Sequence, residues 1–409
     1  MNDSIRSITV RYYLVWAWYT LGPFIVFAIY PLFLRSRGLD QFEINVVSAV
    51  FVLMTFLTDL PTGAFADAAG RRAATVAGCV LHACAFLIYL LSHRYWQFMF
   101  AAAIDGLGTT FGNGPIDAWA IDALDGAGFE GAKDALFSRK FQLSQVVGMC
   151  AALAGAYVAQ LDIAIPIALA AVVWIATGIS AALMMTGGAR PAQPKSAEQM
   201  LQEVRRRSID STRLGFADRN VRWLSVAGLL SALLWYGWGQ EWQQYFNHSL
   251  RAGIARVGWV SVALIAAQVM GLEVAARMRV ASENRASLIA AMTGFAAAAI
   301  IAAARTGSHV YLAVGAIMAA TFAMGIAGPI GFAWFNEVIQ GENRATLLSF
   351  STTMSTLGGI IGLPAQGRLV DAFGISAAWQ IAALVSMTQV FCYLALRPRP
   401  VARNSVESA

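Results

Sequence analysis

Four acidic residues interrupt long apolar stretches of the chain: Asp59, Asp105, Asp117 and Glu241. If such stretches cross a membrane, an acid within them is costly, so it usually faces a cavity and has a function. Asp105 lies about nine residues into its segment, or roughly 14 Å, close to the midplane of a hydrocarbon core about 30 Å thick. This depth makes Asp105 a candidate proton carrier or a contact for a cationic substrate. The structural alternative is a carboxyl group held by hydrogen bonds between helices.

Two of the other acids lie nearer to one end of their segments. Asp59 comes one helical turn before Gly63, and a gating role and a proton-carrying role are equally open for it. Asp117 lies close to a basic stretch, and we interpret it as the ion-pair partner of Arg139 or Lys140. Such a pair would contribute to a gate rather than to a substrate site.

Glu241 lies among aromatic residues. Trp235, Trp238, Trp242 and Tyr245 follow three- and four-residue spacing and therefore share its helical face. A carboxylate beside aromatic rings suits an amphipathic organic cation. An interfacial aromatic belt with an acid that reaches to water explains the same pattern equally well. Further hydrogen bonds to a polar ligand could come from the neighbouring glutamines, Gln240, Gln243 and Gln244.

Residues 59–72 read D-L-P-T-G-A-F-A-D-A-A-G-R-R, and the spacing G-x-x-x-D-x-x-G-R-R is set by Gly63, Asp67, Gly70, Arg71 and Arg72. This stretch resembles the loop between the second and third membrane helices that marks the major facilitator superfamily of transporters. The position after the aspartate, where the family usually has Arg or Lys, is Ala68 here.

The resemblance implies that this loop is a cytoplasmic gate. Asp67 would lie at the inner end of the second helix, Arg71 and Arg72 would begin the third, and Asp122 would end the fourth on the same side. Partly buried ion pairs of this kind can hold the cytoplasmic entrance closed, and they must break and form again when the helices move. The alternative is that the two arginines only fix the orientation of the chain.

Composition places the whole chain in a membrane. Of 409 residues, 58% are hydrophobic and 13% are charged, whereas soluble domains carry about 25% charged residues. The net charge of +6 therefore reflects membrane orientation rather than nucleic-acid binding. The four cysteines lie in apolar segments and are predicted to be buried thiols, and the four histidines are too scattered to suggest a metal site. We expect no cofactor.

Twelve apolar segments are long enough to span a bilayer. They cover residues 11–34, 45–66, 73–92, 96–121, 138–160, 163–186, 221–246, 256–278, 286–304, 309–337, 346–369 and 375–396. The predicted fold is an all-α membrane protein with two pseudo-symmetric six-helix bundles. Its parts are an N-terminal bundle (1–186), a cytoplasmic linker with a possible amphipathic helix (187–220), a C-terminal bundle (221–397) and a cytoplasmic tail (398–409).

An internal repeat supports two similar halves. G-P-I-D-A-W-A-I-D begins at Gly114, and G-P-I-G-F-A-W-F-N begins at Gly328, about half a chain later. Most lysines and arginines fall on one side of the membrane if both termini are cytoplasmic, and we predict that orientation in a cell (inner) membrane.

The superfamily lines its central cavity with the first, fourth, seventh and tenth helices, so the resemblance implies that Trp16, Tyr19 and Trp119 are wall residues. Aromatic packing alone predicts a similar sequence. Glu273 and Arg277 are four residues apart and are expected to pair with each other.

The leading interpretation is a secondary transporter that exports an amphipathic, drug-like compound by alternating access, coupled to protons through the acids at membrane depth. Uptake or facilitated diffusion of a small metabolite stays open, because the segment 138–160 lacks the Gly-Pro pair of the family's antiporter motif. A transporter-like receptor is a minor alternative. The chain has no phosphate-binding loop and no hydrolase motif, so an enzyme is not expected. We expect a monomer whose partners are its small-molecule substrate, protons and the lipid bilayer.

Overall fold

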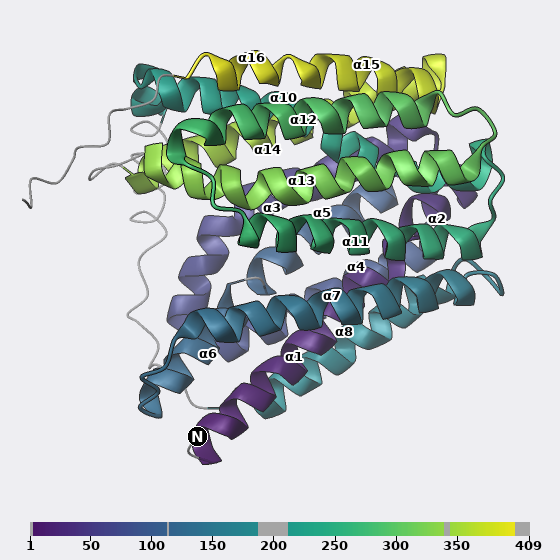
Figure 1. Ribbon diagram of the computed structural model, residues 1–409. Helices are drawn as coiled ribbons and strands as arrows, with labels where there is room; N and C mark the ends of the chain where they lie inside the picture. Colours follow the sequence, from purple (N-terminus) through teal and green to yellow (C-terminus); the bar gives the residue numbers. More distant parts are fainter. Residues whose placement is uncertain (1–2, 113, 187–211, 339–343, 397–409) are drawn as a thin grey trace, which may run out of the picture.

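The computed structural model is almost entirely helical (Figure 1). It describes residues 3–112, 114–186, 212–338 and 344–396. The predicted amphipathic helix of the linker and the predicted tail lie outside these residues.

The first half of the chain forms six membrane-length spans. They are α1 (Asp3–Phe27) with α2 (Tyr30–Ser36), α3 (Gln41–Ala69), α4 (Arg71–Leu91), α5 (Tyr95–Gly112) with α6 (Pro115–Gly126), α7 (Lys133–Val158) and α8 (Ile165–Met184). The first span bends by 46° between its two helices. Pro31 and Pro115 lie in the first turns of α2 and α6, where a missing backbone N–H costs no hydrogen bond.

The second half forms six more. They are α10 (Arg219–Gln244) with the short π-helix η1 (Tyr245–Ser249), α11 (Ile254–Arg277), α12 (Ser282–Ala304), α13 (Val310–Val338), α14 (Arg344–Phe373) and α15 (Ile375–Met387) with α16 (Gln389–Leu394). The predicted all-α fold of two six-span bundles is confirmed. Among the described residues, nine helices, or ten spans if the bent first pair is counted as one, are long and apolar enough to cross a membrane. The two Gly-Pro-Ile repeats differ in structure, because Pro115 begins a new helix whereas Pro329 lies inside α13.

Glycines allow the helices of each bundle to pack closely. A Cβ on Gly155 of α7 would lie 1.8 Å from the carbonyl oxygen of Ile25 in α1. In the other bundle, a Cβ on Gly358 of α14 would lie 2.6 Å from the carbonyl oxygen of Leu229 in α10. Such contacts replace the hydrophobic effect, which does not drive association between helices in lipid.

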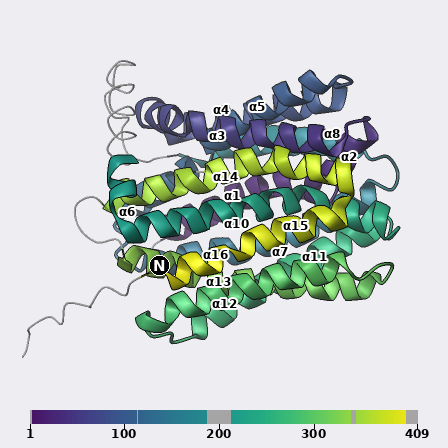
Figure 2. The same cartoon turned by 90° about the horizontal axis from the view of Figure 1, so that it is seen from above.

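The two bundles meet at one end of the molecule, which we name the distal end. It contains the first residues of α3 and α11 and the last residues of α7 and α14. α14 packs against α3 as well as α10, and Figure 2 shows these helices running alongside one another. Toward the opposite end, where α1 begins, the ribbons of α1, α6 and α7 diverge from those of α13 and α14 (Figure 1).

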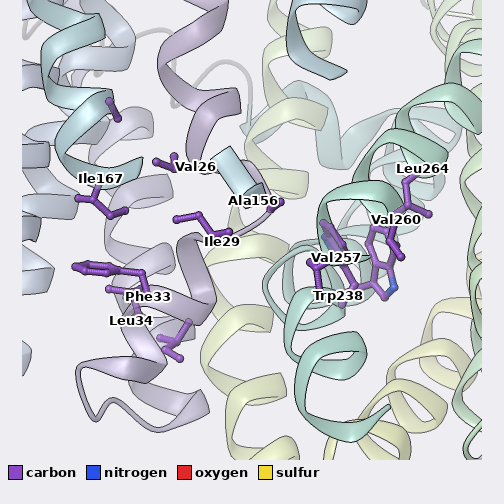
Figure 3. Close-up of a cluster of buried hydrophobic side chains, with 14 of the residues drawn as sticks. Val26, Ile29, Phe33, Leu34, Ala156, Ile167, Trp238, Val257, Val260 and Leu264 are labelled. Atoms are coloured by element: carbon purple, nitrogen blue, oxygen red, sulfur yellow. The ribbon is translucent and has the colours of Figure 1, made fainter. Parts of the chain in front are cut away.

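Apolar packing continues across the bundle boundary at the distal end. Ile29 between α1 and α2, Ala156 of α7 and Val257 of α11 belong to one buried cluster (Figure 3). A Cβ on Gly258 would lie 2.5 Å from the Cβ of Ala156, so α7 and α11 are in close contact.

The prediction of four buried thiols is wrong for two of them. Cys79 and Cys392 are buried, but Cys84 and Cys150 are exposed at the protein surface. Positions that face lipid are as apolar as positions that face the protein interior, so an apolar neighbourhood in the sequence does not distinguish the two.

Candidate functional site

A histidine and an aspartate pair inside the first bundle. His82 of α4 and Asp105 of α5 approach to 2.6 Å between Nδ1 and Oδ1, and their side chains are 4% and 18% exposed. The imidazole stacks on the indole of Trp174 at 3.9 Å between ring centroids, and the ring of Tyr19 meets that indole edge-on at 5.0 Å. The stacked indole therefore holds the imidazole in place beside the carboxylate.

This pair can hold a proton between two titratable groups at membrane depth. The second ring nitrogen of His82, Nε2, is buried and has no hydrogen-bond partner among the described residues. Which nitrogen carries the proton is set by the hydrogen bond that the other makes. In this arrangement Nδ1 of His82 is bonded to Asp105, and Nε2 has no partner among the described residues.

The position of Asp105 was predicted from the sequence, but its partner was not. His82 lies nine residues before the end of α4, and Asp105 lies ten residues after the start of α5. Because the two helices are consecutive and antiparallel, equal distances from the connecting turn place both side chains at one depth. Counting from that turn could have found the pair.

Asp117 forms the second polar contact of this bundle. Its carboxylate pairs with Lys140 Nζ at 2.9 Å, as the sequence predicted, and also accepts a hydrogen bond from Tyr12 Oη at 2.8 Å. The Lys140 ammonium lies 4.1 Å from the ring centroid of Trp16. These contacts join α1, α6 and α7 into one unit.

Glu241 lies in the distal interface and is fully buried. Its Oε1 accepts a hydrogen bond from the Asn45 amide at 3.2 Å, and its Oε2 accepts from the Gln366 amide at 3.0 Å and the Trp379 indole at 2.8 Å. The Asn45 amide also donates to the backbone carbonyl of Leu363 at 2.9 Å. Four helices, α3, α10, α14 and α15, therefore converge on one carboxylate.

The aromatic surroundings of Glu241 differ from the prediction. The indole that donates to it is Trp379 of α15. Trp235 and Trp238 instead pack edge-on against each other at 5.3 Å, and Trp238 is buried. Helical spacing identifies residues on one face of α10, whereas the nearest ring comes from another helix that the spacing cannot reveal.

A second carboxylate holds α3 at the same end. Asp371 of α14 accepts the backbone N–H groups of Gln41 and Phe42, at 3.1 Å and 2.9 Å, in the first turn of α3. The guanidinium of Arg368 lies 3.6 Å from the ring centroid of Phe42. A carboxylate is favourable at a helix N-terminus because it accepts the free N–H groups and meets the positive end of the dipole.

The signature loop lies at the opposite end, where the bundles diverge. Asp67 and Arg71 form an ion pair at 2.6 Å with exposed fractions of 54% and 34%. Gly70 between α3 and α4 has φ +95°, a backbone conformation that favours glycine. Within the described parts of the chain, Arg72 and Asp122 make no ion pair, and a Cβ on Gly63 would meet open space. The gate cluster is thus not assembled in this conformation.

The remaining predicted residues divide between exposed and packed positions. Asp59 is exposed on α3. Trp16 is partly buried and donates from its indole to Ser144 Oγ at 2.6 Å. Trp119 is 1% exposed and donates to the carbonyl of Thr186, so it packs inside its own bundle here. Glu273 and Arg277 pair at 2.6 Å on an exposed surface, as predicted.

Comparison with known proteins gives one family and several related folds. The family model described as Major Facilitator Superfamily matches residues 16–245 and 224–409. The solved structure of the nucleoside transporter NupG has a TM-score of 0.74 at 12% identity and covers 97% of this chain and 99% of its own. No curated protein sequence matches the chain.

Two other similar structures are those of bacterial homologues of transporters. A homologue of the iron transporter ferroportin in the inward-facing state has a TM-score of 0.72 at 13% identity, with 95% of this chain and 99% of that chain covered. A homologue of the human lysosomal transporter Spinster, inward-facing and unoccupied, has a TM-score of 0.72 at 12% identity, with 96% and 95% covered. At such identities the likeness concerns the fold.

Proposed function

The chain belongs to the Major Facilitator Superfamily and is a membrane transporter of the secondary kind, and we propose that it exports an amphipathic organic compound in exchange for protons. The two bundles rock about a site near the midplane, which is reached from one side of the membrane at a time. The substrate binds from the cytoplasm and leaves at the distal end.

The observation that carries proton coupling is the pair of His82 and Asp105. Two titratable side chains, at 2.6 Å and largely buried, are expensive at membrane depth unless they have a function. The imidazole and the carboxylate together take up a proton in one conformation and release it in the other. Tyr19, a predicted wall residue of the first helix, lies edge-on to the His82 ring and is itself buried in this conformation.

The conformation supports entry from the cytoplasm. Bonds from Asn45 to Glu241 and from the first turn of α3 to Asp371 close the distal end, whereas the bundles diverge at the end where α1 begins (Figure 1). The bias of lysine and arginine favours that end as the cytoplasmic one, and both termini lie on that side of an inner membrane in this proposal. Two of the similar structures are also inward-facing.

The signature loop is the cytoplasmic gate in this proposal. Asp67 and Arg71 are already paired and exposed, so they are available to new partners when this end closes. Asp122 and Arg72 complete the cluster in the closed state. Gly63 then provides the space in which α3 approaches the second bundle.

A transport assay in cells tests the proposal. Accumulation of amphipathic cations and anions is compared between cells with the parent protein and cells with Asp105→Asn, with and without a protonophore. Glu273→Gln is the matched control, because it removes an exposed carboxylate whose ion-pair partner among the described residues is Arg277 on its own helix.

We expect the parent and the control to lower the accumulation of some compounds, and both the protonophore and Asp105→Asn to abolish this effect. Raised accumulation in the parent would instead establish uptake, the other direction left open by the sequence. Equal export by the parent and Asp105→Asn would remove the assigned role of the pair.

A further inference from the structure

The Glu241 carboxylate has neutral partners only. Its three hydrogen-bond donors are the amides of Asn45 and Gln366 and the indole of Trp379. Within the residues that the structure describes, no lysine, arginine or histidine forms an ion pair with it. A fully buried carboxylate is stable only while such donors replace the water that it has lost.

The donors do not all belong to the same bundle. Gln366 and Trp379 are on α14 and α15 and move with Glu241, whereas Asn45 is on α3 of the other bundle. When the bundles separate at the distal end, Glu241 loses the Asn45 amide and keeps the other two donors. The opened site then has a carboxylate whose Oε1 needs a new donor.

Unpaired amide oxygens lie in the same network. Gln41 Oε1 and Gln366 Oε1 are buried without hydrogen-bond partners among the described residues. Gln41 is tied to the network through its own amide, which donates to Asn45 Oδ1 at 2.9 Å. Gln366 lies against Gly237, where a Cβ would come within 2.0 Å of its Oε1, so the glycine provides the room for this side chain. Of these two oxygens, Gln366 Oε1 belongs to the same bundle as Glu241 and stays beside it when the bundles separate.

Aromatic rings surround this acceptor-rich site. The Trp379 ring packs against Tyr245 at 4.7 Å between centroids, and Trp242 packs against Phe27 of the other bundle at 5.9 Å. Opening of the distal end separates Trp242 from Phe27 and leaves a ring face available. A cation beside a Trp face gains further attraction when it is partly dehydrated.

We propose that Glu241 and the amide oxygen of Gln366 form, when the distal end is open, a binding site for an organic cation with several N–H groups on an aromatic body, such as an amidinium. This inference rests on the proposed transport function and specifies the substrate class. An N–H group of the cation replaces the Asn45 amide on Glu241, and another N–H group pairs with Gln366 Oε1, which stays with Glu241 in the second bundle. A proton on Glu241 removes the charge but leaves that oxygen without a donor.

The ligand and the closed interface use the same carboxylate oxygen. Asn45 cannot donate to Glu241 while the cation occupies it, so the distal end closes again only after release. A ligand can shift a conformational equilibrium only by its difference in affinity between the states. Because this cation binds only the distal-open state, it increases the population of that state.

The test measures distal opening with a single cysteine. The four native cysteines are first replaced, and a single cysteine is then introduced as Ala156→Cys. This position is chosen because Ala156 is fully buried in the contact of α7 with α11. Leu161→Cys, at a position 82% exposed beyond α7, is the always-accessible control. The rate of labelling by a maleimide is measured in lipid nanodiscs with benzamidine, with its neutral analogue benzamide, and with phenyltrimethylammonium, a cation without N–H groups.

Benzamidine should raise the labelling rate of Ala156→Cys about threefold or more and leave Leu161→Cys unchanged. The two analogues should have little effect, and Glu241→Gln should abolish the effect of benzamidine. If Glu241→Gln does not fold, Glu241→Asp retains the charge on a shorter side chain and should weaken the effect. An equal response to benzamidine in the parent and in Glu241→Gln would overturn the proposed site. The site would also be overturned if acidification raised the labelling rate of Ala156→Cys while benzamidine did not change it.

The transport assay separates this inference from the proposed function. If export is coupled to protons and is unchanged in Glu241→Gln, the proposed cation site at Glu241 is wrong and the proposed export function stands. If the response to benzamidine depends on Glu241 but the protein exports none of the compounds, the cation site stands and the proposed export function is wrong.

Discussion

The Asn45 amide of α3 donates to the buried Glu241 carboxylate of α10 across the boundary between the bundles, at 3.2 Å. The same amide nitrogen donates to the carbonyl of Leu363 in α14 at 2.9 Å. One side chain of the first bundle therefore satisfies two acceptors of the second. Any motion that opens the distal end must break both bonds together.

Asn45→Ala should favour the distal-open state, because it removes both bonds and leaves Glu241 with one donor fewer. A lost hydrogen bond to a charged group costs about 1.5–3 kcal/mol, which changes the ratio of closed to open molecules by roughly tenfold or more. The measurement is the labelling rate of Ala156→Cys. Asn284→Ala removes an amide from the exposed first turn of α12 and should leave the rate unchanged; an equal increase in both variants would contradict the assigned role of Asn45.

Gly367→Val should open the distal end by steric conflict alone. A Cβ at this position would lie 2.7 Å from the Cα of Phe42 and 2.9 Å from the carbonyl oxygen of Gln41, so α14 and α3 cannot keep their spacing. Labelling of Ala156→Cys should rise as it does in Asn45→Ala. Gly315→Val is the matched control, because a Cβ on Gly315 of α13 meets nothing within 4 Å. Unchanged labelling in Gly367→Val would show that the close contact of α14 with α3 is not needed to keep the distal end closed.

Asp117→Asn should destabilise the first bundle more than Asp125→Asn. Asp117 is 28% exposed and holds both Lys140 and Tyr12, whereas Asp125 is 52% exposed and pairs with Lys133. Exposed ion pairs contribute roughly 0–1 kcal/mol, while removal of one partner of a largely buried pair costs several times more. Thermal unfolding midpoints in the same detergent give the comparison. Equal midpoints would mean that the first pair is as weak as a surface pair.

His82→Gln and Asp105→Asn should not be additive. The two side chains contact each other at 2.6 Å, so either substitution removes the same interaction, and residues in contact couple by about 0.5–3 kcal/mol. The double variant should therefore lose less stability than the sum of the two single losses, measured by thermal unfolding. Additive losses would show that the imidazole and the carboxylate act independently.

The sequence was sufficient for the spans and for contacts between neighbours in the chain. Apolar length alone predicts twelve helices, and four-residue spacing predicts the pair of Glu273 and Arg277. The ion pair of Asp117 with Lys140 was also predictable, because a short loop joins the helices that carry this acidic and this basic residue.

The distal network was not predictable from one sequence. Asn45, Gln366 and Trp379 come from three helices in both halves of the chain, and their convergence on Glu241 depends on how the bundles are rotated against each other. A polar side chain in an apolar segment indicates burial with a partner, but periodicity does not identify the partner. The pair of His82 with Asp105 differs, because counting residues from the turn between α4 and α5 places both side chains at one depth.

Distances between spin labels at both ends test alternating access most directly. One pair, Leu161→Cys with Ser249→Cys, spans the bundles at the distal end, and the other, Glu130→Cys with Glu283→Cys, spans them at the opposite end; all four positions are exposed. Addition of Gly367→Val to each background should lengthen the first distance and shorten the second. A distal distance that lengthens while the other stays unchanged, or two distances that lengthen together, would contradict a protein whose ends open in turn.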